Sequence, residues 1–160
     1  MSEPTEIREL QSQIDHQIEV LGELVIYLGS YIANRPEGAE ATREDGLVVA
    51  GVLENYYTAA ETILLRIVQQ FGNELDAERW HASLLDRLAV DVSDVRPRVL
   101  ADVTCARLDE LRRFRHFKRY YYRIDYDWDK LTFLIKKTNE VQPLLVTDLQ
   151  RFSEFLGRLG

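Results

Sequence analysis

The sequence predicts an all-α protein built as an antiparallel bundle of four to five helices. Apolar residues recur at spacings of three and four over long segments, and no alternating stretch is long enough for a strand. Only four prolines and eight glycines interrupt the 160 residues. With 46% hydrophobic residues, we expect one domain over residues 1–160 with its own core.

The first expected helix covers residues 5–33, and the second covers residues 43–71. A cluster of turn-forming residues at 34–38 separates them. The second segment is apolar nearly all round, which is typical of a helix at the centre of a bundle or in a subunit interface.

A third helix is expected over residues 77–88, followed by a loop at 91–102 with a proline near its centre. The fourth helix is expected over residues 103–123. After two capping carboxylates, Asp125 and Asp127, a fifth helix reaches Leu159 with a kink or break at Pro143. The third helix should turn four side chains inward: Trp80, Leu84, Leu85 and Leu88.

The chain lacks a long apolar run and the charge order of a signal peptide, and its lone cysteine, Cys105, allows no internal disulfide. We therefore expect a soluble, cytoplasmic protein that does not enter a membrane. The three histidines are too far apart in sequence to suggest a metal site, so no metal or other cofactor is expected. A net charge of −7 argues against broad coating of nucleic acid.

A basic and aromatic run at residues 107–123 stands out from this acidic background. It contains seven Lys or Arg residues against two acids, a balance of +5, so the rest of the chain carries −12. An anion that binds this protein should therefore bind here, by local focusing of the field. Arginine suits phosphate because its planar fork donates two parallel hydrogen bonds.

On a continuous helix, Arg115, Arg119 and Tyr122 would share one stripe about 60° wide. A second side would carry aromatic residues: Phe114, Phe117 and Tyr121. We expect this aromatic side to enter the core and the arginine side to meet solvent, a ligand or a second subunit. Leu108 and Leu111 fall on the arginine stripe, which favours a dimer interface beside it.

A simpler interpretation remains open for these residues. Arg113, Arg115 and Arg119 could pair with acidic residues of neighbouring helices, and His116 could be a packing or hydrogen-bonding partner. Glu61, on a mostly apolar helix, must be paired if it is buried, either by the basic run or by a core salt bridge.

The pattern Phe114-Arg115-His116-x-x-Arg119-x-x-Tyr122 resembles the HepT-like branch of the HEPN helical bundles. Leu108-x-x-Leu111 precedes it and Asp127-Trp128 follows it. Weaker similarity extends over most of the chain, through short patterns: Tyr57-x-x-x-Glu61, Trp80-His81-x-x-Leu84-Leu85, Arg96-Pro97-x-Val99 and Asp148-Leu149-x-x-Phe152. The resemblance implies a HEPN-type bundle.

The resemblance also implies the toxin half of a toxin–antitoxin pair. Such a toxin is a homodimeric, metal-independent ribonuclease, controlled by an MNT-type nucleotidyltransferase that transfers AMP to a tyrosine. The family site reads Arg, four residues, His, one residue, Tyr. On this chain the Arg is Arg115, Tyr120 occupies the histidine position, and Tyr122 is the implied acceptor, with Tyr120 and Tyr121 as alternatives.

The tyrosine at the histidine position is a departure that bears on activity, because a phenol of pKa about 10 is a poor base near neutrality. The expected catalytic residues are therefore Arg115 and Tyr120, with His116 as a substitute base that flanks the stripe. Expected phosphate contacts are Arg113, Lys118 and Arg119, with support from Tyr57 and Glu61. RNA is a candidate partner beside the nucleotidyltransferase. Two alternatives stay open: a HEPN module that binds its partner without cleaving RNA, and a structural bundle whose cations only form ion pairs.

Overall fold

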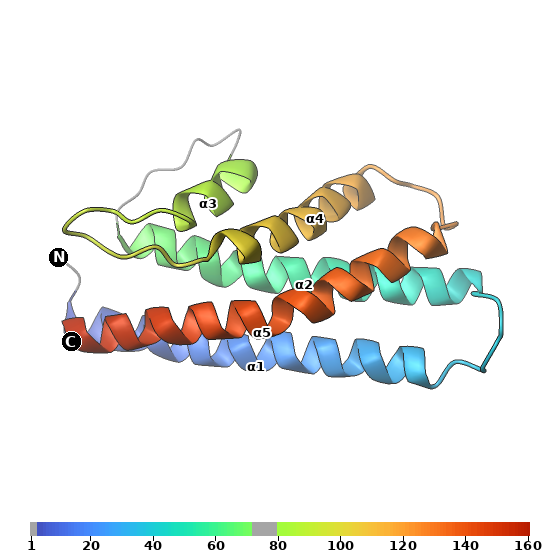
Figure 1. Ribbon diagram of the computed structural model, residues 1–160, viewed down its shortest axis with the longest axis horizontal. Helices are drawn as coiled ribbons and strands as arrows, with labels where there is room; N and C mark the ends of the chain where they lie inside the picture. Colours follow the sequence, from blue (N-terminus) through green and yellow to red (C-terminus); the bar gives the residue numbers. More distant parts are fainter. Residues whose placement is uncertain (1–2, 72–79) are drawn as a thin grey trace.

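The computed structural model describes residues 3–71 and 80–160, which form an antiparallel bundle of five helices (Figure 1). The described chain contains no strand, only an isolated bridge between Val92 and Arg96. The predicted all-α fold is confirmed. The helices are α1 (Pro4–Ala33), α2 (Arg43–Gln70), α3 (Trp80–Leu88), α4 (Asp102–Arg119) and α5 (Trp128–Leu159).

Helix α2 lies at the centre of the bundle and contacts each of the other four helices. Helices α1 and α5 run side by side, so that α1 begins at the end of the bundle where α5 finishes (Figure 1). The predicted central place of the second helix is confirmed. Its buried side chains include Val49, Leu53, Tyr56, Tyr57, Ala60, Ile63, Leu64, Ile67 and Val68. No helix in the described part of the chain has the length and apolar character needed to cross a membrane.

Two helix starts carry side-chain caps that fix where the elements begin. Thr42 accepts a hydrogen bond from the backbone N–H of Asp45, and the Asp45 carboxylate accepts one from the N–H of Thr42. That bond, with a second from the Tyr31 hydroxyl, lowers the pKa of Asp45 to about 2. Asp127 caps α5, as predicted, by accepting from the N–H groups of Asp129 and Lys130.

The start of α4 is held by a buried carboxylate from another helix. Asp148 on α5 is 4% exposed. Its Oδ2 accepts from the Ala101 N–H at 3.0 Å and from the buried Thr104 hydroxyl at 2.6 Å. Its Oδ1 lies 3.3 Å from an Arg151 guanidinium nitrogen. Because Ala101 is the N-cap of α4, this carboxylate ties the start of α4 to α5.

The end of the fourth helix was predicted wrongly. Helix α4 finishes at Arg119, with Tyr120 as its C-cap, and residues 121–127 form a loop to α5. Helical periodicity continued to Arg123, but the Tyr121 ring packs between Phe117 and Tyr126 and holds the chain in a turn. Tertiary packing therefore ends the helix earlier than local pattern suggests.

The other expected boundaries lie within two residues of the observed ones wherever the structure describes them. Helix α5 continues through Pro143 without a break, and Figure 1 shows that its axis bends near the middle. Leu84, Leu85 and Leu88 are buried, as predicted. The predicted start of α3 at residue 77 and the side chain of Trp80 lie outside the described residues.

Two adjacent buried tyrosines on α2 should respond differently to loss of their hydroxyl groups. The Tyr56 hydroxyl donates to Gln142 at 2.6 Å, whereas the Tyr57 hydroxyl makes no hydrogen bond of good geometry, although Glu61 lies near enough to raise the pKa of its phenol. We expect Tyr56→Phe to lower the free energy of unfolding by about 1 kcal/mol at pH 7 and Tyr57→Phe to change it by less than about 0.5 kcal/mol. Chemical denaturation of both variants measures this, and a larger loss in Tyr57→Phe would contradict it.

The same tyrosines predict a loss of stability in alkali. Burial raises the pKa of both phenols, and Glu61 adds to the rise at Tyr57. Each phenol has a higher pKa in the folded protein than in the unfolded chain, where it is about 10. Its contribution to stability is therefore complete below pH 10 and declines as the pH rises above 10. Between pH 9 and 11 the double variant Tyr56→Phe, Tyr57→Phe should therefore lose about 2–3 kcal/mol less stability than the wild type.

Candidate functional site at the end of helix α4

The guanidinium of Arg115 faces helix α2 and is already partnered. Its Nε donates to the Thr58 hydroxyl at 3.0 Å, and an Nη lies 3.6 Å from Oε1 of Glu61. The Arg115 side chain is 22% exposed and that of Glu61 is 6% exposed. The predicted support from Glu61 is thus a largely buried ion pair between α2 and α4. Tyr57 belongs to the same group, because the charges of Arg115 and Glu61 act on the pKa of its phenol in opposite directions.

Other cations of the basic run are also neutralised. Lys118 lies 3.4 Å from Glu54 of α2. Arg112 and Arg113 both pair with Asp109 of their own helix, at 2.7 and 2.8 Å. The interpretation of these cations as ion-pair partners therefore applies to most of them, Arg115 included. It also explains how an acidic protein can pack a basic helix against α2.

Two cations at the end of the run remain available. Arg119 and Arg123 are exposed, and neither makes an ion pair or hydrogen bond with a residue that the structure describes. Between them, the chain leaves the helix and presents two tyrosines to solvent: Tyr120 is 62% exposed and Tyr122 is 87% exposed. His116 is also exposed, and its ring meets that of Tyr120 edge to face with centroids 5.2 Å apart.

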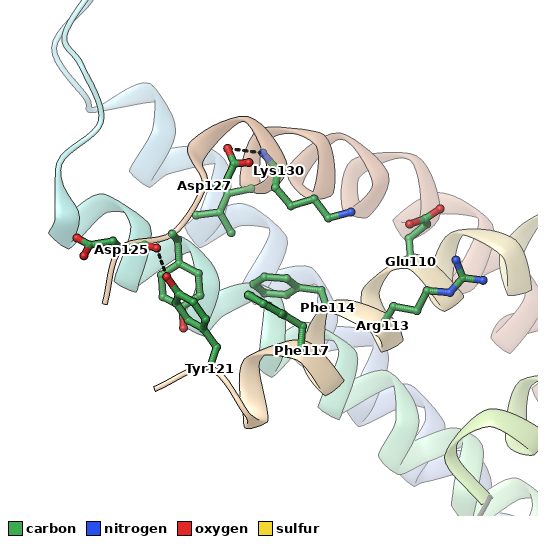
Figure 2. A pocket seen from close by; sticks show the side chains of 10 residues that line it. Glu110, Arg113, Phe114, Phe117, Tyr121, Asp125, Asp127 and Lys130 are labelled. Atoms are coloured by element: carbon green, nitrogen blue, oxygen red, sulfur yellow. Dashed lines mark hydrogen bonds between the residues drawn. The ribbon is translucent and has the colours of Figure 1, made fainter. Parts of the chain in front are cut away.

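Tyr121 differs from its two neighbours because its side chain is anchored. Its ring stacks on Phe117 with centroids 4.9 Å apart and packs against Tyr126 at 5.1 Å. Its hydroxyl donates to the backbone carbonyl of Asp125 (Figure 2). The anchored ring fixes the loop so that Tyr120 and Tyr122 stay outward. We call residues 119–123, with these two exposed tyrosines and two unpaired arginines, the tyrosine loop.

Three expectations from helical geometry are corrected here. Tyr122 does not continue a stripe with Arg115 and Arg119, because it lies beyond the end of α4. Leu108 and Leu111 are buried in the core, so they form no apolar surface beside the arginines. Of the three aromatic residues expected in the core, Phe114 is buried, whereas Phe117 is 49% exposed and Tyr121 is half-buried.

A pocket of about 530 Å³, which was not predicted from the sequence, lies between the end of α4 and the start of α5 (Figure 2). Its floor and walls are aromatic: Phe114, Phe117, Tyr121 and Tyr126. The spacing of the first three residues along α4 was visible in the sequence. Nothing in the sequence indicated that Tyr126 folds back to close the group. Among the described residues, no cluster of three or more His, Cys, Asp or Glu side chains could hold a metal ion.

The helix order, the central α2 and the Arg115-to-Tyr122 segment at the α4–α5 junction define the class of this protein: an all-α bundle of the HEPN type. A model of the HepT-like protein family matches residues 48–156. The chain therefore belongs to the HepT-like proteins, and the match includes Glu61, Arg115 and the tyrosine loop. No curated protein and no solved structure matches the chain. The family resemblance is confirmed, whereas a functional role for Tyr120 at the histidine position stays a prediction.

Proposed function

We propose that this protein is the toxin of a toxin–antitoxin pair and that an MNT-type nucleotidyltransferase silences it by transferring AMP to Tyr122. The observation that carries this proposal is the setting of Tyr122. It is the most exposed large hydrophobic side chain of the described residues, at 87%, and it stands between unpaired Arg119 and Arg123. Family membership supports the assignment as a toxin-like HEPN module. The exposed tyrosines and arginines of the tyrosine loop support the assignment of this loop as the site where AMP is added.

The proposed transfer uses the Tyr122 phenol as nucleophile. Its oxygen attacks the α-phosphorus of ATP, pyrophosphate leaves, and the phenolic proton passes to solvent or to a base of the partner enzyme. The product is a tyrosyl phosphodiester with one negative charge. Arg119 and Arg123 are the exposed cations closest to Tyr122 in the sequence, so the added charge would lower the positive charge that an RNA backbone needs.

The three tyrosines of the loop differ in how accessible they are as acceptors of AMP. The Tyr121 hydroxyl is engaged with the carbonyl of Asp125, and its ring lies between two aromatic neighbours. Tyr120 is exposed, but its ring packs on His116. Tyr122 makes neither kind of contact within the described chain. Access for a partner enzyme therefore favours Tyr122 first and Tyr120 second.

The direct test is expression in a bacterial host with and without the nucleotidyltransferase encoded beside this chain. We expect the chain alone to slow growth, and co-expression to restore growth and add AMP-sized increments to the intact mass. A matched control is the same nucleotidyltransferase with its catalytic carboxylates replaced, which should leave mass and toxicity unchanged. Rescue of growth without any added mass would contradict the proposed control by AMP transfer.

Cleavage of RNA is the second candidate function, and the contact between His116 and Tyr120 favours it. The imidazole lies against the ring that occupies the histidine position of the family site, and it is exposed to substrate. His116 would remove the proton from a ribose 2′-hydroxyl, and Arg119 would stabilise the charge that develops on the attacked phosphate. A homodimer, as expected for the family, would bring a second tyrosine loop to the same RNA.

Substitution of His116 tests this second function. We expect His116→Gln to lower the rate of RNA cleavage in EDTA by about 100-fold, because general base catalysis is worth roughly 10²–10⁴. The matched control is His16→Gln, which removes an exposed histidine on α1 and should not change the rate. If wild-type protein does not cleave RNA, or if both variants cleave it equally well, the nuclease assignment to this site is wrong.

A further inference from the structure

The aromatic pocket between α4 and α5 has the composition of a site for a flat, charged ligand. Phe114, Phe117, Tyr121 and Tyr126 form a continuous group, with neighbouring ring centroids 4.9–6.4 Å apart. Phe117 lines the pocket of about 530 Å³ and is 49% exposed, while Tyr121 stacks on its ring. This volume falls within the range of small-molecule sites and suits a nucleoside.

Charged side chains of both signs lie at the rim of the pocket. Figure 2 shows Glu110 and Arg113 at one end and Tyr121 and Asp125 at the other, with Phe114 and Phe117 between them. Lys130 extends towards the end that holds Glu110. The two aspartates near the loop are already engaged: Asp125 pairs with Arg43, and Asp127 caps α5. Glu110 pairs with no cation among the described residues.

This arrangement matches the edge of an amino-purine. Stacking on Phe117 would hold the flat base, and Glu110 would accept from its exocyclic amino group. Arg113, which pairs with Asp109, and Lys130, which lies over the Phe133 ring, carry further N–H donors at the same end. A purely apolar ligand would leave Glu110 without a donor, whereas the amino group of a base supplies one there.

We propose that this pocket binds the adenine base of an adenosine monophosphate group, stacked on Phe117 with its amino edge at Glu110. The adenine base in the pocket can belong to free AMP or to AMP attached to Tyr122. The second case rests on the proposed function. Tyr121 lines the pocket, whereas the next residue, Tyr122, is exposed and does not line it, so a nucleotide on Tyr122 would fold back over Tyr121 to enter the loop end of the pocket. The base would extend towards Glu110 while Arg119 and Arg123 face the phosphate. Modification would then cover the tyrosine loop with a docked group as well as change its charge.

Binding of free AMP to the unmodified full chain tests the pocket without any partner enzyme. We expect saturation-transfer NMR to show contact from the protein to the adenine protons H2 and H8. Phe117→Ala should raise the dissociation constant about tenfold, because a base stacked on an aromatic side chain is worth about 1–3 kcal/mol. The control is Tyr27→Ala, which removes an aromatic ring of similar exposure, 52%, from α1. Ribose 5-phosphate should not compete, because it lacks the base.

These measurements distinguish failure of the proposed pocket from failure of the proposed function. No transfer to the adenine protons, or equal affinity in Phe117→Ala and wild type, would overturn the pocket even if Tyr122 is modified. Circular dichroism of Phe117→Ala is the control for folding, and we expect a spectrum equal to that of the wild type because the ring is half-exposed. In chain carrying AMP on Tyr122, the attached base should exclude free AMP. Undiminished binding of free AMP there would overturn the attached source and leave free nucleotide as the ligand.

Discussion

Replacing Tyr122 by phenylalanine should abolish the addition of AMP by the partner nucleotidyltransferase. The substitution removes only the phenolic oxygen, which is the nucleophile of the proposed transfer, from a side chain that contacts no described residue through that oxygen. The fold and the basic charge of the tyrosine loop are preserved. Toxicity should therefore persist in cells that contain the antitoxin. Intact mass and growth, each measured with and without the partner, provide the two readouts.

Matched substitutions at the neighbouring tyrosines make this prediction specific. Tyr120→Phe keeps the contact with His116 and should still be modified. Tyr121→Phe loses the hydrogen bond to Asp125, so we expect modification that is slower but still present. The assignment would fail if Tyr122→Phe gained AMP at the wild-type rate. It would also fail if Tyr120→Phe were the variant that stayed unmodified.

Removal of the Asp148 carboxylate should produce the largest loss of stability among the polar residues discussed. We expect Asp148→Ala to lower the free energy of unfolding by about 2–4 kcal/mol. The substitution leaves the Thr104 hydroxyl, which is 0% exposed, and the Ala101 N–H without their acceptor. Both groups belong to the start of α4, so the loss should appear as fraying of that helix as well as lower overall stability.

Denaturant unfolding of four variants measures this effect. The matched control is Glu154→Ala, which removes an exposed carboxylate from the same helix and should change stability by less than about 0.5 kcal/mol. A double-mutant cycle of Asp148→Ala with Thr104→Val should show coupling of about 1 kcal/mol or more. Equal stabilities of Asp148→Ala and Glu154→Ala would show that the carboxylate does not hold α4.

Most of the fold was predictable because each long helix has its own apolar pattern and most helix ends carry a clear start or stop signal. Residues 34–38 ended α1 and Asp127 started α5 as expected. The end of α4 was not predictable, because the aromatic residues after Arg119 continue a helical period. Only the tertiary packing of Tyr121 against Tyr126 decides that the chain turns there.

The candidate site was predictable in its residues but not in its arrangement. The sequence indicated that a buried Glu61 would pair either with the basic run or in a core salt bridge, and the structure places it against Arg115 of that run. The sequence does not indicate which arginines remain unpaired, because that depends on the register of α4 against α2. That register brings Glu54 to Lys118 and Glu61 to Arg115, and Arg119 pairs with no acidic residue that the structure describes.

The most direct measurement of the central claim is fragmentation mass spectrometry of the peptide that contains the tyrosine loop, from wild-type chain co-expressed with its nucleotidyltransferase. The exposure of Tyr122 and the anchoring of Tyr121 predict fragment ions that place the AMP group on Tyr122. An AMP group on Tyr121, or a peptide that stays unmodified while the partner suppresses toxicity, would contradict the account.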